Sequence, residues 1–202
     1  MTEFERKVFN TLNDHIYLTE CSSDDLDEVC RILDCTLHSG ATRWALVFPK
    51  HKIVFKFPKY NETSRDYCAM ELKNYELGKK FGIEKCLLPI SYIGTLECDI
   101  PIYVQPMYTV SVSDTDYRVS RSYEEKCEKL RGSVVFRKIC RGIYDTPPRV
   151  WVARATQIYG KKFMRKFEQW SHAGKVNDLH SSNVGWLRKQ PIIIDYAGYQ
   201  GD

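Results

Sequence analysis

The order of strand-type and helix-type segments in the first half of the chain most constrains its fold. Four segments rich in β-branched and aromatic residues form two pairs, and one helical segment separates the pairs. The strand-type segments are Arg43–Phe48, Lys52–Phe57, Leu87–Thr95 and Ile100–Met107, and the helical segment is Thr63–Lys80. The turn Pro49–His51 joins the first pair as an antiparallel hairpin. This order predicts an α+β fold with an antiparallel sheet and one inserted helix.

The second half of the chain is predicted to be mostly helical. Val150–His172 has helical spacing and is followed by Gly174, which would end a single long helix. After it, Val184–Leu187 and Ile192–Ile194 predict a small hairpin. Pro147-Pro148 marks the boundary that precedes this half.

A further helix is predicted near the N-terminus. Ser22 to Asp24 form a capping signal ahead of apolar residues at helical spacing, so Asp24–Asp34 should be helical. We therefore expect one domain in three parts. Residues 1–107 form a sheet-rich lobe with this N-terminal helical extension, residues 108–149 a basic insert or linker, and residues 150–202 a smaller helical lobe. Two lobes imply a cleft, and a cleft suggests a ligand.

Charge is distributed unevenly along a chain whose net charge is +4. Residues 1–35 contain nine acidic and three basic residues, whereas residues 118–168 contain fourteen basic and five acidic ones. The basic segment, in which we expect a helix over Tyr123–Cys140, could attract phosphates, nucleic acid or an acidic protein surface. It could equally be an ordinary solvated helical face.

The eight cysteines are scattered and form no CxxC pair or Cys/His metal-ligand spacing. We expect reduced thiols that mostly fill the core, in preference to disulfides or a zinc site. The longest apolar runs, such as Ile192–Ile194, are far shorter than the roughly 18 residues that a membrane helix needs, and the N-terminus does not resemble a signal peptide. The sequence favours a soluble, intracellular protein without a membrane partner.

Five polar residues carry the strongest chemical signal. Asp178 and Asn183 lie in Asp-Leu-His-Ser-Ser-Asn, and Asp195 closes an apolar strand. They could supply one proton acceptor and two oxygen ligands for a hard cation. Upstream, Lys56 ends a predicted strand and Glu71 lies in the next helix, where they could form an ion pair. Such a pair could hold the lysine against nucleotide phosphates, so this set has the chemistry of phosphoryl transfer.

The ordered combination of these residues resembles the protein kinase-like fold, and most closely short serine/threonine kinase-like proteins encoded by tailed bacteriophages. The resemblance extends from about residue 26 to residue 198 and implies ATP with Mg²⁺ or Mn²⁺. It implies that Lys56 contacts the α- and β-phosphates and that Glu71 orients this lysine. It further implies that Asp178 accepts the proton of the attacking hydroxyl and that Asn183 and Asp195 hold the metal.

Two further segments would contact the nucleotide by the same resemblance. Ser39, Gly40, Ala41 and Thr42 would form the loop over the phosphates, and Gln105, Pro106 and Met107 would form the hinge that meets adenine. The loop contains one glycine where the usual kinase loop has up to three, so nucleotide could be held less tightly.

Only four residues follow Gly198, so we expect a truncated helical lobe without an activation segment or a C-terminal platform for a peptide substrate. Substrate capture would then fall to the basic region Arg118–Lys166. This region would favour an acidic or nucleic-acid-associated host target. A homodimer could complete the lobe in trans.

Alternative functions remain open at this point. The first is an active ATP-dependent phosphotransferase that modifies serine or threonine in host proteins, in the cytoplasm of an infected cell. The second is a nucleotide-binding pseudokinase that acts as an interaction or inhibitor module for a host protein. A small-molecule kinase is a weaker third option, because such enzymes generally have larger substrate-binding helical regions after the catalytic loop.

Overall fold

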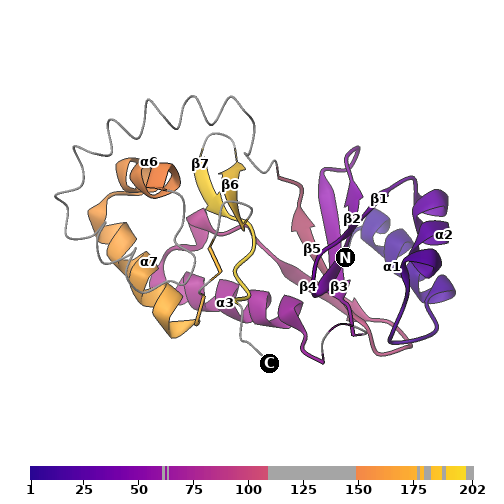
Figure 1. Cartoon of the computed structure of the whole chain (residues 1–202). Helices are drawn as coiled ribbons and strands as arrows, with labels where there is room; N and C mark the ends of the chain where they lie inside the picture. The colour runs from indigo at the N-terminus through magenta and orange to yellow at the C-terminus, as the bar shows by residue number, and fades with distance from the viewer. Residues whose placement is uncertain are drawn as a thin grey trace. The chain divides into compact units, whose positions relative to one another are not determined.

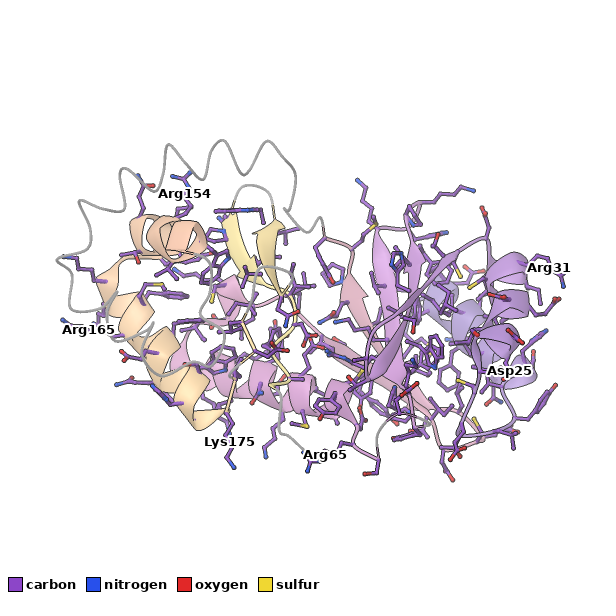
Figure 2. The ribbon with its side chains drawn as sticks, viewed as in Figure 1. Asp25, Arg31, Arg65, Arg154, Arg165 and Lys175 are labelled. Carbon is purple, nitrogen blue, oxygen red and sulfur yellow. The ribbon has the colours of Figure 1, made fainter. Side chains whose placement is uncertain are left out.

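The structure is a computed structural model that describes residues 1–60, 62, 64–108, 149–176, 178–179, 183–187 and 190–198. Figure 1 shows its elements and Figure 2 its described side chains. The chain is mixed α+β, as predicted. Most of the predicted basic insert, including the helix expected over Tyr123–Cys140, lies outside the described residues. In the part that is described, no helix has the length and apolar character needed to span a membrane.

The described residues divide into two compact units. One contains residues 1–72 and 89–107, and the other contains residues 73–88 and those described from 108 onward. Residues 73–88, which we assigned to the N-terminal lobe, therefore pack with the second unit. Helix α3 (Tyr67–Phe81) begins in the first unit and ends in the second.

The first unit is built on a five-stranded antiparallel sheet with the order β1-β2-β3-β5-β4. Its strands are β1 (Thr36–Ser39), β2 (Arg43–Phe48), β3 (Ile53–Pro58), β4 (Ser91–Thr95) and β5 (Pro101–Pro106). The first predicted hairpin is confirmed, whereas β1 was missed because it is short and mostly exposed. The strand expected from Leu87 begins only at Ser91, because Leu87 instead bridges to Ile193 in the second unit.

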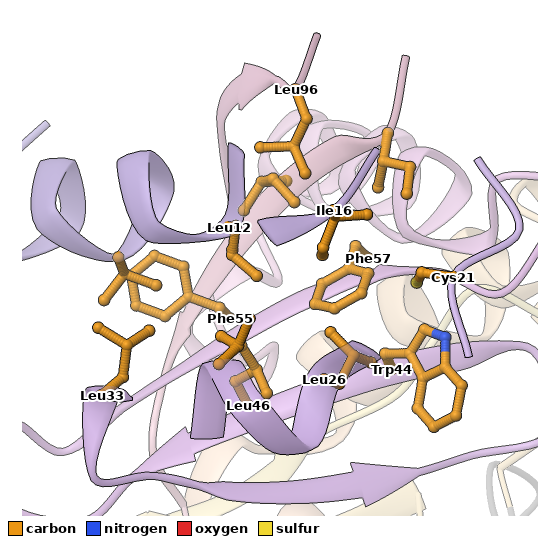
Figure 3. Close-up of a cluster of buried hydrophobic side chains, with 14 of the residues drawn as sticks. Leu12, Ile16, Cys21, Leu26, Leu33, Trp44, Leu46, Phe55, Phe57 and Leu96 are labelled. Carbon is orange, nitrogen blue, oxygen red and sulfur yellow. The ribbon is translucent and has the colours of Figure 1, made fainter. Parts of the chain in front are cut away.

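Two helices pack on one face of this sheet and enclose an apolar core. They are α1 (Glu3–His15), which we did not predict, and α2 (Ser23–Leu33), which we predicted to within one residue. Both begin with a capping box. The core between helices and strands, drawn in Figure 3, contains Leu12, Ile16, Leu26, Leu33, Trp44, Leu46, Phe55 and Phe57. The members of this core that lie on β2 and β3 occupy every second position of each strand, so they all point to the face that the helices cover.

The intervening strand residues face the opposite side of the sheet. Lys56 lies between Ala45 of β2 and Tyr103 of β5, and Gln105 lies opposite Val54. The start of α3 is fixed to this side through Asp66, whose carboxylate accepts the Ala69 N–H at 2.9 Å and the Tyr103 hydroxyl at 2.7 Å. The pleat thus brings a lysine and a glutamine toward the first turns of a helix.

The second unit contains helices and a small hairpin. Besides the end of α3, its elements are the short helix η1 (Glu84–Cys86), α6 (Arg149–Tyr159), α7 (Lys161–Ala173), β6 (Val184–Leu187) and β7 (Gln190–Ile193). The hairpin was predicted. It is fixed to α6 by two side chains: the Trp151 indole donates to the Ile192 carbonyl at 3.1 Å, and the Tyr159 hydroxyl donates to the Pro191 carbonyl at 2.8 Å.

The prediction of a single long helix over Val150–His172 is wrong, because the helix is interrupted at Gly160. This residue has φ of 85°, and α7 begins at the next residue. Such a φ is strained for residues with a Cβ and accessible to glycine. The apolar spacing continues across the break, which is why the sequence pattern suggested one helix.

Alanine at Gly160 is expected to lower the free energy of unfolding by about 1–3 kcal/mol, because φ of 85° with ψ of 160° is a combination essentially restricted to glycine. No described atom lies within 4 Å of the position of the added Cβ, so backbone strain is the sole cost. Urea denaturation can compare this variant with Gln169→Ala, an exposed substitution on α7 that should change stability by less than about 0.5 kcal/mol. Equal midpoints for the two variants would contradict the strained break.

Candidate functional site

Lys56 and Glu71 form an ion pair in the first unit, as their sequence context suggested. The Lys56 ammonium lies 3.3 Å from Glu71 Oε2 and 3.5 Å from Oε1. Both side chains are buried, Glu71 completely. Lys56 extends from the face of β3 that α1 and α2 leave uncovered, and Glu71 lies one turn into α3. The pair therefore follows directly from the strand pleat and the position of the helix.

Two more side chains bind the same carboxylate. The Arg43 guanidinium donates to Glu71 Oε2 at 2.9 Å, and the Gln105 amide donates to Oε1 at 2.8 Å. A buried carboxylate is stable only with such charged and neutral donors around it. Our sequence analysis left Arg43 out of the site, although it lies two residues before Ala45 in β2 and so on the face of the sheet that carries Lys56.

The carboxamide oxygen of Gln105 is buried and lacks a hydrogen-bond partner within the described part of the chain. The amide orientation is well defined, because exchanging nitrogen and oxygen would place the oxygen against the Glu71 carboxylate. A buried acceptor of this kind normally finds a donor in water, in a bound molecule or in another part of the chain. The Gln105 oxygen is therefore a point where a further donor could join this cluster.

The expected hinge residues have restricted hydrogen-bonding capacity. Gln105 directs its side chain to Glu71, Pro106 has no N–H, and the Met107 N–H donates to the Lys52 carbonyl at 2.7 Å. Pro106 and Met107 could thus offer an adenine ring only their carbonyl oxygens. Recognition through a main-chain donor would have to come from another residue.

Ser39, Gly40, Ala41 and Thr42 include the turn of the β1–β2 hairpin. The Gly40 N–H donates to the Arg43 carbonyl at 2.9 Å, which closes the turn. A Cβ at Gly40 would meet one carbonyl oxygen, that of Arg43, at the ordinary contact distance of 3.4 Å. The fold of the turn therefore does not itself demand glycine, and the missing side chain leaves room above the backbone.

Cys68 lies one helical turn before Glu71 and is fully buried. Burial raises the pKa of its thiol well above the ordinary value, so the group stays protonated at neutral pH and is a poor nucleophile. The six cysteines of the described residues are all free thiols, as expected. Cys68 is therefore not a candidate nucleophile beside the Lys56 cluster.

Asn183 and Asp195 lie side by side in the second unit. The β6–β7 hairpin pairs Val184 with Ile193, and the N–H groups of Ile194 and Asp195 donate to the Asn183 carbonyl at 2.8 and 3.3 Å. The Asn183 amide in turn donates to the main-chain carbonyl of Asp178 at 2.8 Å. Asn183 thus contacts both other residues that the sequence singled out in this half, Asp178 through its side chain and Asp195 through its main-chain carbonyl.

The donor chemistry of this cluster fits a hard cation. The nitrogen of the Asn183 carboxamide binds the Asp178 carbonyl, so its oxygen is the atom suited to a metal, as is the carboxylate of Asp195, whose N–H donates to the Asn183 carbonyl. Among the described residues, no group of three or more His, Cys, Asp or Glu could hold a metal. A cation at Asn183 and Asp195 would thus keep several water or substrate ligands, which is the habit of Mg²⁺.

Asn74 supports the segment after Asp195 and was missed by the sequence analysis. Its buried amide donates to the carbonyls of Tyr196 at 2.8 Å and Ala197 at 3.4 Å. The Trp170 indole donates to the Asn74 carbonyl at 2.8 Å, which fixes this turn of α3 to α7. The one available signal was its spacing of three residues from Glu71 in a predicted helix.

Comparisons of the chain with protein-family models, curated proteins and solved structures found no match. The function is therefore inferred from the two polar clusters themselves.

Proposed function

We propose that the chain is an ATP-dependent phosphotransferase with a kinase-like, two-lobed fold, which transfers phosphate to serine or threonine of a protein. The observation that carries this proposal is the buried Lys56–Glu71 pair at 3.3 Å, where a strand lysine is held by a helix carboxylate. Kinase-type transfer uses such a pair to place an ammonium at the nucleotide phosphates. The Asp178, Asn183 and Asp195 cluster supplies the remaining chemistry.

Each residue has a defined part in the proposed reaction. The ammonium of Lys56 neutralises phosphate charge, and Glu71 keeps it oriented. The Asp178 carboxylate accepts the proton of the substrate hydroxyl. At the same time the hydroxyl oxygen bonds to the γ-phosphorus, and the bond between that phosphorus and the ADP oxygen breaks. Asn183 and Asp195 would hold Mg²⁺, which when bound supplies further charge neutralisation at the phosphates.

An acidic protein segment is the proposed kind of substrate. Helix α7 exposes Lys161, Lys162, Arg165, Lys166 and His172, and its one acidic residue is Glu168. Figure 2 labels Arg165 on this helix. Two lysines begin α7 without any acid in its first turn, an order that the helix dipole disfavours. Lysines at these positions do not stabilise the helix, which is an argument that they bind an anionic partner.

A nucleotide-binding pseudokinase is the second candidate. Arg43 approaches Glu71 more closely, at 2.9 Å, than Lys56 does, at 3.3 Å. A carboxylate held by arginine in this way could orient Lys56 poorly for catalysis while the nucleotide still binds. This observation gives the non-catalytic function a physical basis.

Incubation with labelled ATP and Mg²⁺ or Mn²⁺ distinguishes the two functions. The purified protein is tested alone and with an acidic protein such as dephosphorylated casein, and label on serine or threonine is the result expected of the phosphotransferase. Stabilisation against heat by ATP without transfer would favour the pseudokinase. A protein that neither transfers label nor gains thermal stability with ATP would contradict both proposals.

A further inference from the structure

Lys59 is a buried lysine beneath the β1–β2 hairpin that the proposed reaction does not use. Lys59 is the first residue after β3, and it is 8% exposed. The ammonium lies 3.2 Å from Ser39 Oγ and 3.5 Å from the Gly40 carbonyl, and the Lys59 N–H donates to the Thr42 carbonyl at 3.0 Å. One residue thus holds both sides of the turn formed by residues 39–42.

Among the described residues, the surroundings of this ammonium compensate its charge only weakly. The carboxylate of Glu62 lies 3.7 Å from the ammonium. Because the Glu62 side chain is 54% exposed, this pair neutralises little of the lysine charge. The ammonium also lies 4.5 Å from the centre of the Trp44 ring, a cation–π contact that stabilises charge without neutralising it. A positive charge therefore remains directly below the hairpin turn.

We propose that Lys59 is a positioning residue for the phosphates of a bound nucleotide, an inference that rests on the proposed function. Its donors are directed to Ser39 and Gly40, so it acts through the turn and not as a direct ligand. A loop with several glycines can adapt to phosphates after they bind, whereas a loop with one glycine has to be held ready beforehand. Holding the turn in place lowers the conformational entropy lost on binding, and the buried charge attracts the anion.

The test compares the binding of ADP with that of adenosine by isothermal titration calorimetry. Lys59→Met retains the aliphatic packing on Trp44 and removes the charge, and it should weaken ADP binding about tenfold, as loss of a charge-assisted hydrogen bond does. Adenosine lacks phosphates, so its affinity should change less than about twofold. Ser39→Ala should weaken ADP binding less, and the double variant should bind ADP no worse than Lys59→Met, because both changes break one connection.

Lys50→Met is the matched control. Lys50 lies in the exposed turn after β2 and pairs with Asp34, so its removal should leave both affinities unchanged. If Lys59→Met does not fold by circular dichroism, Lys59→Gln, which retains a donor, should show a smaller loss for ADP alone. Two results would overturn the role of Lys59 but leave the proposed function intact. One is wild-type ADP affinity in the folded Lys59 variant, and the other is an equal loss of affinity for ADP and adenosine. Failure of the wild-type protein to bind ADP or ATP would overturn both.

Discussion

Alanine at Asp178 is expected to reduce phosphoryl transfer by about a hundredfold to ten-thousandfold while ATP still binds. The carboxylate is the proposed acceptor of the hydroxyl proton, and loss of a general base typically costs about 10²–10⁴ in rate. The Asn183 amide binds the main-chain carbonyl of Asp178, a contact that alanine at this position retains. The substitution should therefore remove chemistry without removing the loop.

Alanine at Asp195 should give a loss of similar size with a different signature. Asp195 is a proposed metal ligand, so this variant should need a higher Mg²⁺ concentration for ATP to stabilise it against heat. Asp178→Ala should show the wild-type Mg²⁺ requirement. One Mg²⁺ titration, which does not depend on catalytic rate, thus distinguishes the roles of the two aspartates.

Asp27→Ala, an exposed substitution on α2, controls for the loss of an aspartate and should retain full activity. The experiment measures label transfer at saturating ATP together with melting temperature across a Mg²⁺ series. Activity in Asp178→Ala within tenfold of wild type would exclude its role as the base. Identical Mg²⁺ requirements in both acid variants would exclude Asp195 as a metal ligand.

Replacement of Glu71 by glutamine is expected to destabilise the protein by about 3–5 kcal/mol, which is the usual effect of removing one partner from a buried ionic cluster. The Arg43 and Lys56 cations would remain beside a neutral amide in a region where Glu71 itself is completely buried. Total stabilities are typically about 5–15 kcal/mol. This single substitution should therefore produce the largest loss of stability among the variants discussed.

Lys56→Met should have the opposite profile. Glu71 would retain Arg43 at 2.9 Å and Gln105 at 2.8 Å, so the expected loss of stability is about 1–2 kcal/mol. Phosphoryl transfer should nevertheless disappear, because the ammonium proposed to contact the phosphates is lost. One member of the pair thus governs stability and the other governs activity.

Urea denaturation followed by circular dichroism measures the first effect, and the labelled-ATP assay measures the second. Arg43→Met is a useful companion, because it removes the other cation and leaves the Lys56–Glu71 pair. It should destabilise the protein but preserve some transfer activity. Equal stability losses for Glu71→Gln and Lys56→Met would show that Arg43 does not compensate the carboxylate, and the proposed division of roles would be wrong.

Local patterns were sufficient to predict α2, the β2–β3 hairpin and the β6–β7 hairpin. Each depends on side-chain alternation, helical spacing or a turn within a few residues, which are properties that the sequence displays directly. The strand-to-helix order also suggested that Lys56 could meet Glu71. The break at Gly160 escaped this reasoning, because one backbone angle changes the direction of the chain without disturbing the apolar spacing.

The sequence by itself determined which residue types could carry phosphate chemistry and on which elements they lie. Only the tertiary structure decided that Arg43 and Gln105 share Glu71, that Asn74 supports the segment after Asp195, and that Lys59 holds the hairpin turn. The physical reason is burial. The sequence letter of an arginine, asparagine or lysine is the same whether the side chain is solvated or enclosed by distant parts of the chain. Here the partners lie as far as 123 residues away in sequence.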